Sequence, residues 1–156
     1  MDELTEALKS PPAPRKGDVL FRDDLPDRHN NACLNSTFDL DYLGYTEGYR
    51  RGARHLAEHV ASSQQDQDFL VYPVIFLYRH HVELALKRLI SRTPDLIDKP
   101  LTKAEKTHLG SHRLDLLWRD LKPRLIFTSK LAGWAEPAHD DIEGVDEYIT
   151  QLTVLD

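Results

Sequence analysis

Hydrophobic residues recur at helical spacing along most of the chain after residue 38. In the segment 68–92 they cover more than half of the helix circumference, which is typical of a helix at the centre of a bundle. Pro73 falls in the first turn, where proline is tolerated, and Pro94 is expected to end the helix. A narrow polar strip remains on this helix, formed by Arg79, His80, Glu83 and Lys87.

The segment 40–62 predicts a helix before the central one. Its apolar residues recur at steps of three and four, and Asp39 is the expected N-cap. Glycines stand at every fourth position, at Gly44, Gly48 and Gly52. Each glycine costs about 1 kcal/mol of helix stability relative to alanine. We expect their shared face to let another helix approach closely, unless the first turns are not helical.

Three more helices are expected after the central one. A short helix covers about 101–109, and a longer one covers about 111–125. Ser111 is the expected N-cap of the longer helix, and Pro123 should kink or shorten its end. The last helix covers about 139–155. Because no useful strand alternation occurs, the sequence predicts an all-α bundle of about four helices.

The beginning of the chain differs from the rest. The run 11–14, Pro-Pro-Ala-Pro, stops any preceding helix, because proline lacks a backbone donor and restricts its predecessor. The polar residues that follow show no periodicity. We therefore divide the chain into an irregular N-terminal arm, residues 1–38, and a helical bundle domain, residues 39–156.

Composition limits the class of protein. The chain has 156 residues, the size of one domain, and its single cysteine, Cys33, excludes an intrachain disulfide. Residues 1–10 have no basic stretch followed by an apolar run, so they do not form a signal peptide. The longest apolar run, 69–78, is far shorter than the roughly 20 residues of a membrane span. These features predict a cytoplasmic protein with no membrane contact.

Charge is unevenly distributed within the net −6 of the chain. Residues 50–130 carry 15 basic and 9 acidic groups, whereas residues 131–156 carry 7 acidic groups and no basic one. The interpretation we favour is that the acidic ends neutralise the basic middle inside one fold. The alternative is a basic surface that meets an anionic partner such as RNA.

Two Arg-x4-His pairs in the segment 40–62 are catalytic candidates. They join Arg50 to His55 and Arg54 to His59. An arginine stabilises a pentavalent phosphate while a histidine moves the proton, which is the chemistry of metal-independent RNA cleavage. The spacing is common in a chain with 8 histidines. A charged helix surface is therefore the alternative, and the one that we favour.

The same segment contains His55-x-x-Glu58-His59, the spacing of the inverted zinc-protease motif. A third ligand would be needed, and Glu136 is available. Those proteases are larger mixed α/β domains, so we favour a solvated helix face. No glycine-rich phosphate loop and no Cys/His zinc-ribbon spacing occur. We therefore predict no metal site and no cofactor.

The polar strip of the central helix offers a second candidate site. Its candidates for binding an anion or a nucleotide are Arg79, His80 and Lys87. Arg79 would act as the anion clamp. The alternative, which we favour, is a structural ladder in which Glu83 pairs with both neighbouring cations. An aspartate of the 111–125 helix, Asp115 or Asp120, would extend that ladder.

Two stretches resemble HEPN-like helical domains of bacteria and archaea. The first, residues 72–90 (YPVIFLYRHHVELALKRLI), carries an Arg-x-x-x-Glu-x-x-x-Lys ladder on an apolar helix. The second, residues 110–121 (GSHRLDLLWRDL), is similar to the Gly-x-His-x-Leu-x-x-Leu opening of a following helix. The family's catalytic Arg-x4-6-His commonly lies late in the domain, whereas the matches here lie early. His112 matches a recurrent histidine whose role in the family is capping, folding or catalysis.

The resemblance implies a helical bundle that often dimerises, acts in phage defence or toxin–antitoxin systems, and in active members cuts RNA. The leading hypothesis is therefore a self-associating, RNA-directed defence effector or accessory domain. If the chain is an enzyme, we expect a metal-independent ribonuclease. The first alternative is a non-enzymatic interaction module that docks a partner protein on its C-terminal helix and acidic tail. The second alternative is a metal-dependent hydrolase.

Overall fold

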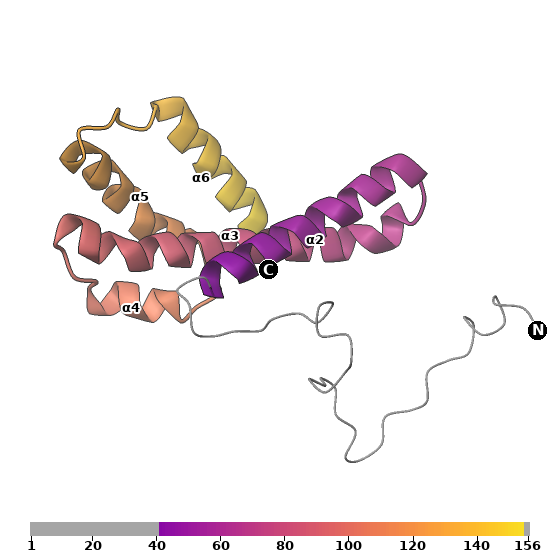
Figure 1. Ribbon diagram of the computed structural model, residues 1–156, viewed down its shortest axis with the longest axis horizontal. Coiled ribbons are helices and arrows are strands. Elements are labelled where there is room, and N and C mark those ends of the chain that lie inside the picture. The colour runs from indigo at the N-terminus through magenta and orange to yellow at the C-terminus, as the bar shows by residue number, and fades with distance from the viewer. Residues whose placement is uncertain (1–40, 155–156) are drawn as a thin grey trace, which may run out of the picture. The chain divides into compact units, whose positions relative to one another are not determined.

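The computed structural model describes residues 41–154, and this part of the chain is all-α (Figure 1). Its helices are α2 (Asp41–Ser63), α3 (Gln67–Ile97), α4 (Lys103–Leu109), α5 (Leu114–Leu131) and α6 (His139–Thr153). The predicted all-α bundle is confirmed. The predicted arm, residues 1–38, and the expected cap Asp39 lie outside the described residues. No helix in the described range is both long enough and apolar enough to cross a membrane.

The predicted end of the central helix is wrong, because α3 continues through Pro94 to Ile97. Pro94 has no N–H to donate to the carbonyl of Ile90, one turn earlier. The Thr93 hydroxyl donates to that carbonyl instead, at 2.8 Å. The helix ends at Asp98, which adopts the left-handed conformation (φ 48°) and donates its N–H to the Pro94 carbonyl. A neighbouring hydroxyl thus replaces the hydrogen bond that the proline removes.

The predicted bounds of α5 are also wrong. Pro123 lies inside the helix, which continues to Leu131. Because Pro123 has no N–H, the backbone carbonyl of Arg119, one turn earlier, loses its usual donor. Both residues are exposed, so solvent can donate a hydrogen bond to that carbonyl instead. Ser111 is not the N-cap, because its hydroxyl donates to the carbonyl of His108 at the end of α4. Arg113 occupies the cap position, but its side chain does not cap the helix.

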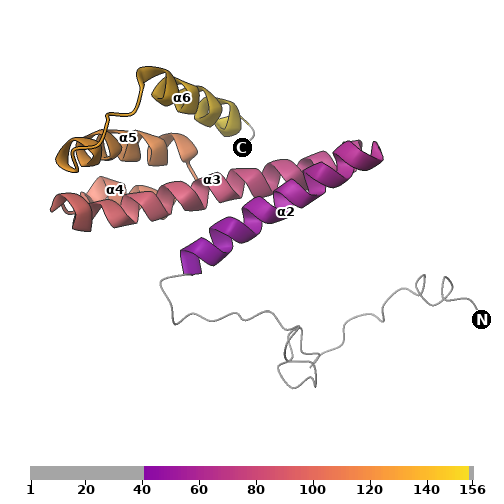
Figure 2. The same ribbon diagram turned by 45° about the horizontal axis from the view of Figure 1, so that its top comes forward.

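The first part of the fold is a hairpin, made by α2 and the first half of α3, residues 67–82. The two helices run side by side in opposite directions (Figures 1 and 2). His81 Nδ1 bonds to the carbonyl of Thr46 at 2.9 Å. A Cβ built on Gly52 would lie 3.7 Å from Leu77, so a helix does approach there. A Cβ built on Gly44 or Gly48 would meet no atom of another element of the described structure within 4 Å, so the expected close approach does not extend to these two glycines.

The second part is a bundle of α4, α5, α6 and the second half of α3, residues 83–97. Its core consists of Leu86, Ile90, Leu114, Leu117, Trp118, Leu121 and Ile149. Helix α6 is tied to α5 by Asp146, which accepts hydrogen bonds from Trp118 Nε1 and Lys122 Nζ. Both parts share α3, and the polar strip of the sequence falls where they meet.

A buried arginine fixes α4 against the rest of the bundle. Arg124 is 5% exposed and donates to both carboxylate oxygens of Glu105, at 2.6 and 2.9 Å. It also donates to the Thr93 hydroxyl and to the backbone carbonyls of Lys99 and Pro100. Glu105 is further held in a capping box with Thr102 at the start of α4. The connection before α4 is thereby fixed to α3 and α5.

Candidate functional site

The polar strip of α3 gathers around one buried carboxylate. Glu83 is 1% exposed, and its Oε1 accepts a hydrogen bond from Lys87 Nζ at 2.9 Å. Its Oε2 lies 3.5 Å from Arg79 Nη1 and 3.9 Å from His80 Nδ1. The ladder expected from the spacing of these residues is thus present. It also brings the three predicted anion-binding residues, Arg79, His80 and Lys87, to one place.

A fifth residue, His112, reaches the same carboxylate from the connection between α4 and α5. Its Nδ1 lies 3.0 Å from Glu83 Oε1, and its backbone carbonyl accepts a hydrogen bond from Arg79 Nη2 at 3.0 Å. Residues 72–90 and 110–121, which are far apart in the chain, therefore meet at Glu83. We call Arg79, His80, Glu83, Lys87 and His112 the Glu83 cluster.

The expected pairing of the ladder with an aspartate of α5 is wrong. Asp115 binds the guanidinium of Arg113, with contacts of 2.8 and 2.6 Å. Asp120 lies 2.6 Å from His108 Nδ1. The Glu83 cluster therefore contains two permanent cations and two histidines around one carboxylate. Neither aspartate contacts the cluster.

The protonation of the cluster follows from these contacts. Burial by itself raises the pKa of Glu83, but hydrogen bonds from Lys87 and His112 outweigh it, so the pKa lies below its usual value. Glu83 is thus an ionised acceptor at neutral pH. When the His112 ring is neutral, its Nδ1 carries the hydrogen and Nε2 is the nitrogen that accepts a proton. With its side chain 77% exposed, His112 is an accessible base oriented by a buried carboxylate.

His80 is held by aromatic neighbours from both helices of the hairpin. Its ring stacks on Phe76, with ring centroids 6.0 Å apart, and meets the edge of Tyr49 at 4.4 Å. Only a quarter of its side chain is exposed, compared with most of His112. These contacts fix the ring beside Glu83. His80 is therefore the less accessible of the two histidines in the cluster.

The arginines of the two Arg-His pairs predicted on α2 both bind carboxylates of the same helix. Arg50 donates to Glu47, with the shortest contact at 2.7 Å, and Arg54 Nε donates to Glu58 at 2.6 Å. His55 and His59 are exposed on the same helix. Both arginines are thus engaged in helical ion pairs at the surface. The interpretation as a charged helix face agrees with this geometry.

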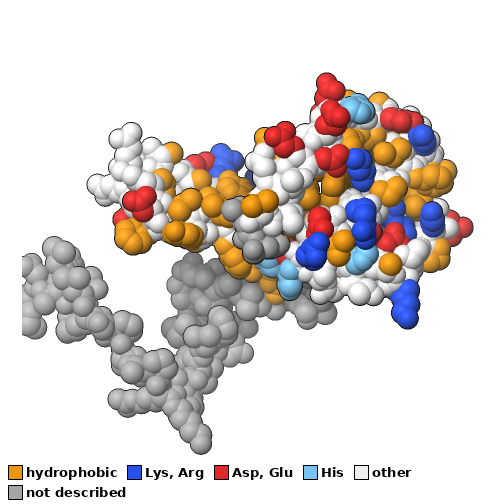
Figure 3. Space-filling model, turned by 180° about the vertical axis from the view of Figure 1, so that it is seen from behind, with side chains coloured by type: hydrophobic (Ala, Val, Ile, Leu, Met, Phe, Trp, Pro, Cys, Tyr) orange, Lys and Arg blue, Asp and Glu red, His pale blue; other side chains and the backbone are white. Residues whose placement is uncertain are grey.

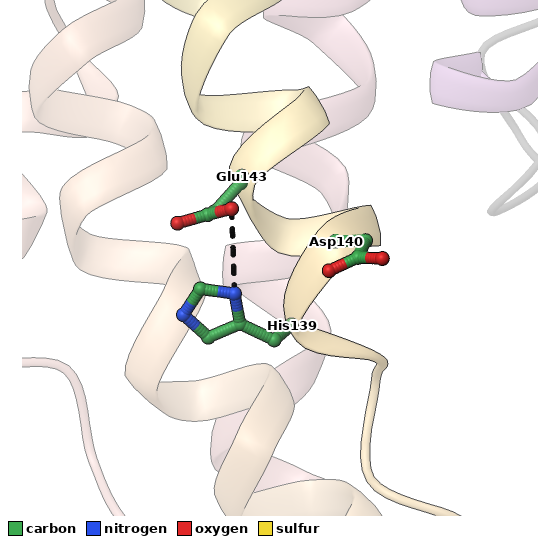
Figure 4. A group of neighbouring side chains, drawn as sticks. All are labelled: His139, Asp140 and Glu143. Atoms are coloured by element: carbon green, nitrogen blue, oxygen red, sulfur yellow. Dashed lines mark ion pairs between the residues drawn. The ribbon is translucent and has the colours of Figure 1, made fainter.

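The zinc-protease spacing on α2 does not gather its ligands either. Glu58 is paired with Arg54, and Glu136 lies 3.2 Å from Lys130 in a different part of the chain. Among the described residues, the group whose ligand atoms all come within 4.8 Å of one another is His139, Asp140 and Glu143 (Figure 4).

That group lies in the first turn of α6 and is exposed, and His139 pairs with Glu143 at 3.4 Å. All its ligand atoms come from one turn of one helix. Exposed acidic groups of this kind are common at helix starts, where they complement the helix dipole. We assign it no function.

Sequence reasoning missed two polar contacts that join different helices. One is the Arg124–Glu105 pair, which no motif marked. The other is the His108–Asp120 pair, 2.6 Å apart, between α4 and α5. The contact of His112 with Glu83 was also missed, although the histidine itself stood in the second stretch of the resemblance. The sequence therefore marked the histidine but not its partner. Residue spacing does not predict the path of the connection that brings His112 to α3.

Comparison with known proteins gives no relative: no protein-family model, no curated protein and no solved structure matches the chain. The HEPN-like assignment rests on the two quoted stretches and stays a prediction. Arguments about function therefore depend on the geometry of the Glu83 cluster.

Proposed function

We propose that the chain is a HEPN-like helical domain that acts on RNA through the Glu83 cluster. The observation that carries the proposal is the contact of His112 Nδ1 with Glu83 Oε1, at 3.0 Å. It joins the two stretches of the resemblance in one arrangement of side chains. Side chains from distant segments converge at a functional site, whereas each stretch by itself predicts only a helix.

The chemistry of the cluster suits a phosphodiester. Arg79 and Lys87 supply positive charge for a phosphate, and both are held in place by Glu83. His112 can accept the proton of a ribose 2′-hydroxyl, whose oxygen would then attack the neighbouring phosphorus. The bond from phosphorus to the 5′-oxygen breaks, so the products are a 2′,3′-cyclic phosphate and a 5′-hydroxyl that takes its proton from solvent or from a second acid. Cleavage of this type needs a base, an acid and cations but no metal ion. The base is His112, and His80 is the second titratable ring beside the same carboxylate.

The Glu83 cluster is a better candidate than the pairs on α2. Arg50 and Arg54 lie on an exposed helix with carboxylates of their own, Glu47 and Glu58. Neither His55 nor His59 is oriented by a buried group. A histidine held by a buried carboxylate has a defined tautomer and orientation, which a solvated histidine lacks. We therefore propose His112 as the base and propose no catalytic role for α2.

The test is incubation of the full chain with a mixed RNA pool in the presence of EDTA, followed by a denaturing gel and a filter-retention assay. We expect retention that weakens with salt, and cleavage that falls about a hundredfold or more in His112→Ala. The matched control is His55→Ala, an exposed histidine outside the cluster. RNA that is retained but not cut would indicate an accessory role. RNA that is neither retained nor cut would refute the proposal.

The alternative, a protein-interaction module docking through the C-terminal helix, receives less support. Ile142, Ile149 and Leu152 of α6 pack on the core of the bundle, so the apolar face of this helix is already used. Tyr148 and Val154 remain exposed. A larger uncovered apolar surface lies elsewhere, on the hairpin.

A further inference from the structure

One side of α3 is continuous from the Glu83 cluster towards the turn that joins α2 and α3. Tyr72, Phe76 and Glu83 all lie on that side, because they stand four and seven positions apart, close to whole helical turns. At Glu83 the side is covered, since Glu83 is 1% exposed and His112 reaches it from the connection between α4 and α5. Beyond His80 the side is open, and Phe76 and Tyr72 are 63% and 74% exposed.

A series of contacts joins the open part of this side to the cluster. The Phe76 ring is stacked on the His80 ring, with 7° between the two planes. His80 Nδ1 lies 3.9 Å from Glu83 Oε2, and His112 Nδ1 lies 3.0 Å from Glu83 Oε1. Phe76 is therefore the first exposed aromatic ring that the helix presents beyond the proposed base, His112.

Charge changes along the same helix. Residues 79–92 carry four basic groups and one carboxylate, whereas residues 55–78 contain three carboxylates and no lysine or arginine. Hydrophobic side chains are visible along the hairpin in Figure 3, where it projects to the left, and most of the basic ones lie to its right. A ligand that follows this side of α3 therefore needs an anionic group at the cluster and a flat, uncharged group beside Phe76.

A nucleotide has this form, because its phosphate is anionic and its base is flat and uncharged. Aromatic side chains bind single-stranded nucleic acid by stacking on its bases, next to cations that hold the phosphates. A paired base inside a duplex is already stacked between its neighbours, so its face is not free for Phe76. The arrangement therefore fits a base that is unpaired.

The acidic end of the hairpin limits the length of the stacking surface. Asp68 is exposed and lies one turn before Tyr72 on the same side of α3. A phosphate beside this carboxylate would be repelled. Phe69 is 75% exposed but adjoins Asp68, so it lies outside the region that favours nucleic acid. The surface is thus confined to Phe76 and Tyr72.

We propose that Phe76 is the stacking platform for one unpaired base of the nucleic acid whose phosphate Arg79 and Lys87 hold, and that Tyr72 extends this platform. The base subsite rests on the proposed function and adds to it a requirement for unpaired bases beside the Glu83 cluster. It gives the exposed rings of α3 a role that the proposed chemistry at His112 does not include.

The test compares two 2′-deoxy strands of equal length and charge, one of deoxyadenosine and one without bases. Both lack the 2′-hydroxyl, so they stay intact during a filter-retention assay with the full chain. The wild type should retain the strand with bases about tenfold more tightly, and Phe76→Ala should lose most of that preference. Phe76→Trp should keep it. Retention of the abasic strand should be the same in all three proteins, because the phosphate contacts are unchanged.

Phe69→Ala is the matched control, since it removes an equally exposed ring of the same helix and should keep the preference. A spectroscopic comparison uses Trp134→Phe as the background, because Trp134 is 68% exposed and Trp118 is buried. In that background, the strand with bases should quench the fluorescence of Phe76→Trp more than that of Phe69→Trp. Circular dichroism checks that every variant folds.

Three results would overturn the base subsite. They are equal retention of the two strands by the wild type, a preference that survives Phe76→Ala, and a preference that Phe69→Ala abolishes equally. Any of them would leave the exposed rings to a protein partner, while RNA cleavage that depends on His112 would still stand. A wild type that retains neither strand and neither retains nor cuts RNA would refute both proposals.

Discussion

The hairpin and the bundle are built from the same helix, yet they bury apolar surface very differently. The bundle encloses a core of seven buried side chains, four of which are fully inaccessible leucines or isoleucines. Among the hairpin residues whose burial the structure describes, 43–82, the one buried hydrophobic residue is Ala53. Two helices can cover only one side of each other, whereas four can enclose a core. The bundle therefore stabilises itself, and the hairpin is left with a surface that a partner can cover.

The largest expected effect is on stability, and it compares a core leucine of the bundle with a leucine of the hairpin. Leu117→Ala in the bundle should lower the free energy of unfolding by about 3 kcal/mol, because it leaves a cavity at a fully buried site. Leu77→Ala in the hairpin should cost about 1 kcal/mol, since Leu77 is only partly buried. Urea unfolding followed by circular dichroism measures both. Equal losses would contradict the comparison.

A second prediction concerns the buried ion pair of the bundle. Hydrogen bonds from Arg124 lower the pKa of Glu105 to about 2. The carboxylate therefore stabilises the fold above its unfolded pKa, near 4.5, and this contribution is lost as the pH falls towards 2. Glu105→Gln should lose about 2 kcal/mol at pH 7 and should show a flatter stability profile between pH 4.5 and 2.

Thermal melts across that pH range test the second prediction. Asp115→Asn serves as the control, because Asp115 is paired with Arg113 at the surface and a surface ion pair contributes little. A wild-type profile unchanged by Glu105→Gln would show that Glu105 does not support the bundle.

The smallest expected effect lies in the hairpin. His81→Phe removes the hydrogen bond from His81 to the Thr46 carbonyl and should cost about 1 kcal/mol or less. Hydrogen exchange should quicken for amides of α2 but not for those of α5, because the hairpin can open while the bundle stays closed. Uniform acceleration along the chain would mean that the two parts unfold together.

Periodicity was enough to predict the helices and the polar strip of α3. The i, i+4 spacing of Glu83 and Lys87 predicted their ion pair, and the structure has it at 2.9 Å. The end of α3 was predicted wrongly because the rule that proline ends a helix takes no account of a hydroxyl on the preceding residue. In Thr93 that hydroxyl supplies the hydrogen bond that the proline cannot.

The candidate site was predicted only in part, because some of its contacts join segments that are far apart in the chain. Arg79, His80 and Lys87 were found because they share one helix, whose geometry is known in advance. The contact of His112 with Glu83 depends on the course of the chain between α4 and α5. Arg124 and Glu105 fix the start of α4 and the connection before it, and nothing in their spacing marks them as a pair. Contacts between distant segments can be identified only once the fold is known.

The length of α3 has a further consequence for how sites are spaced. Tyr72 and Glu83 stand eleven positions apart on one unbroken helix, which separates them by about 16 Å and leaves them on the same side. No loop intervenes between these two side chains. The helical backbone alone sets the interval, and an insertion of one turn between them would lengthen it by about 5.4 Å.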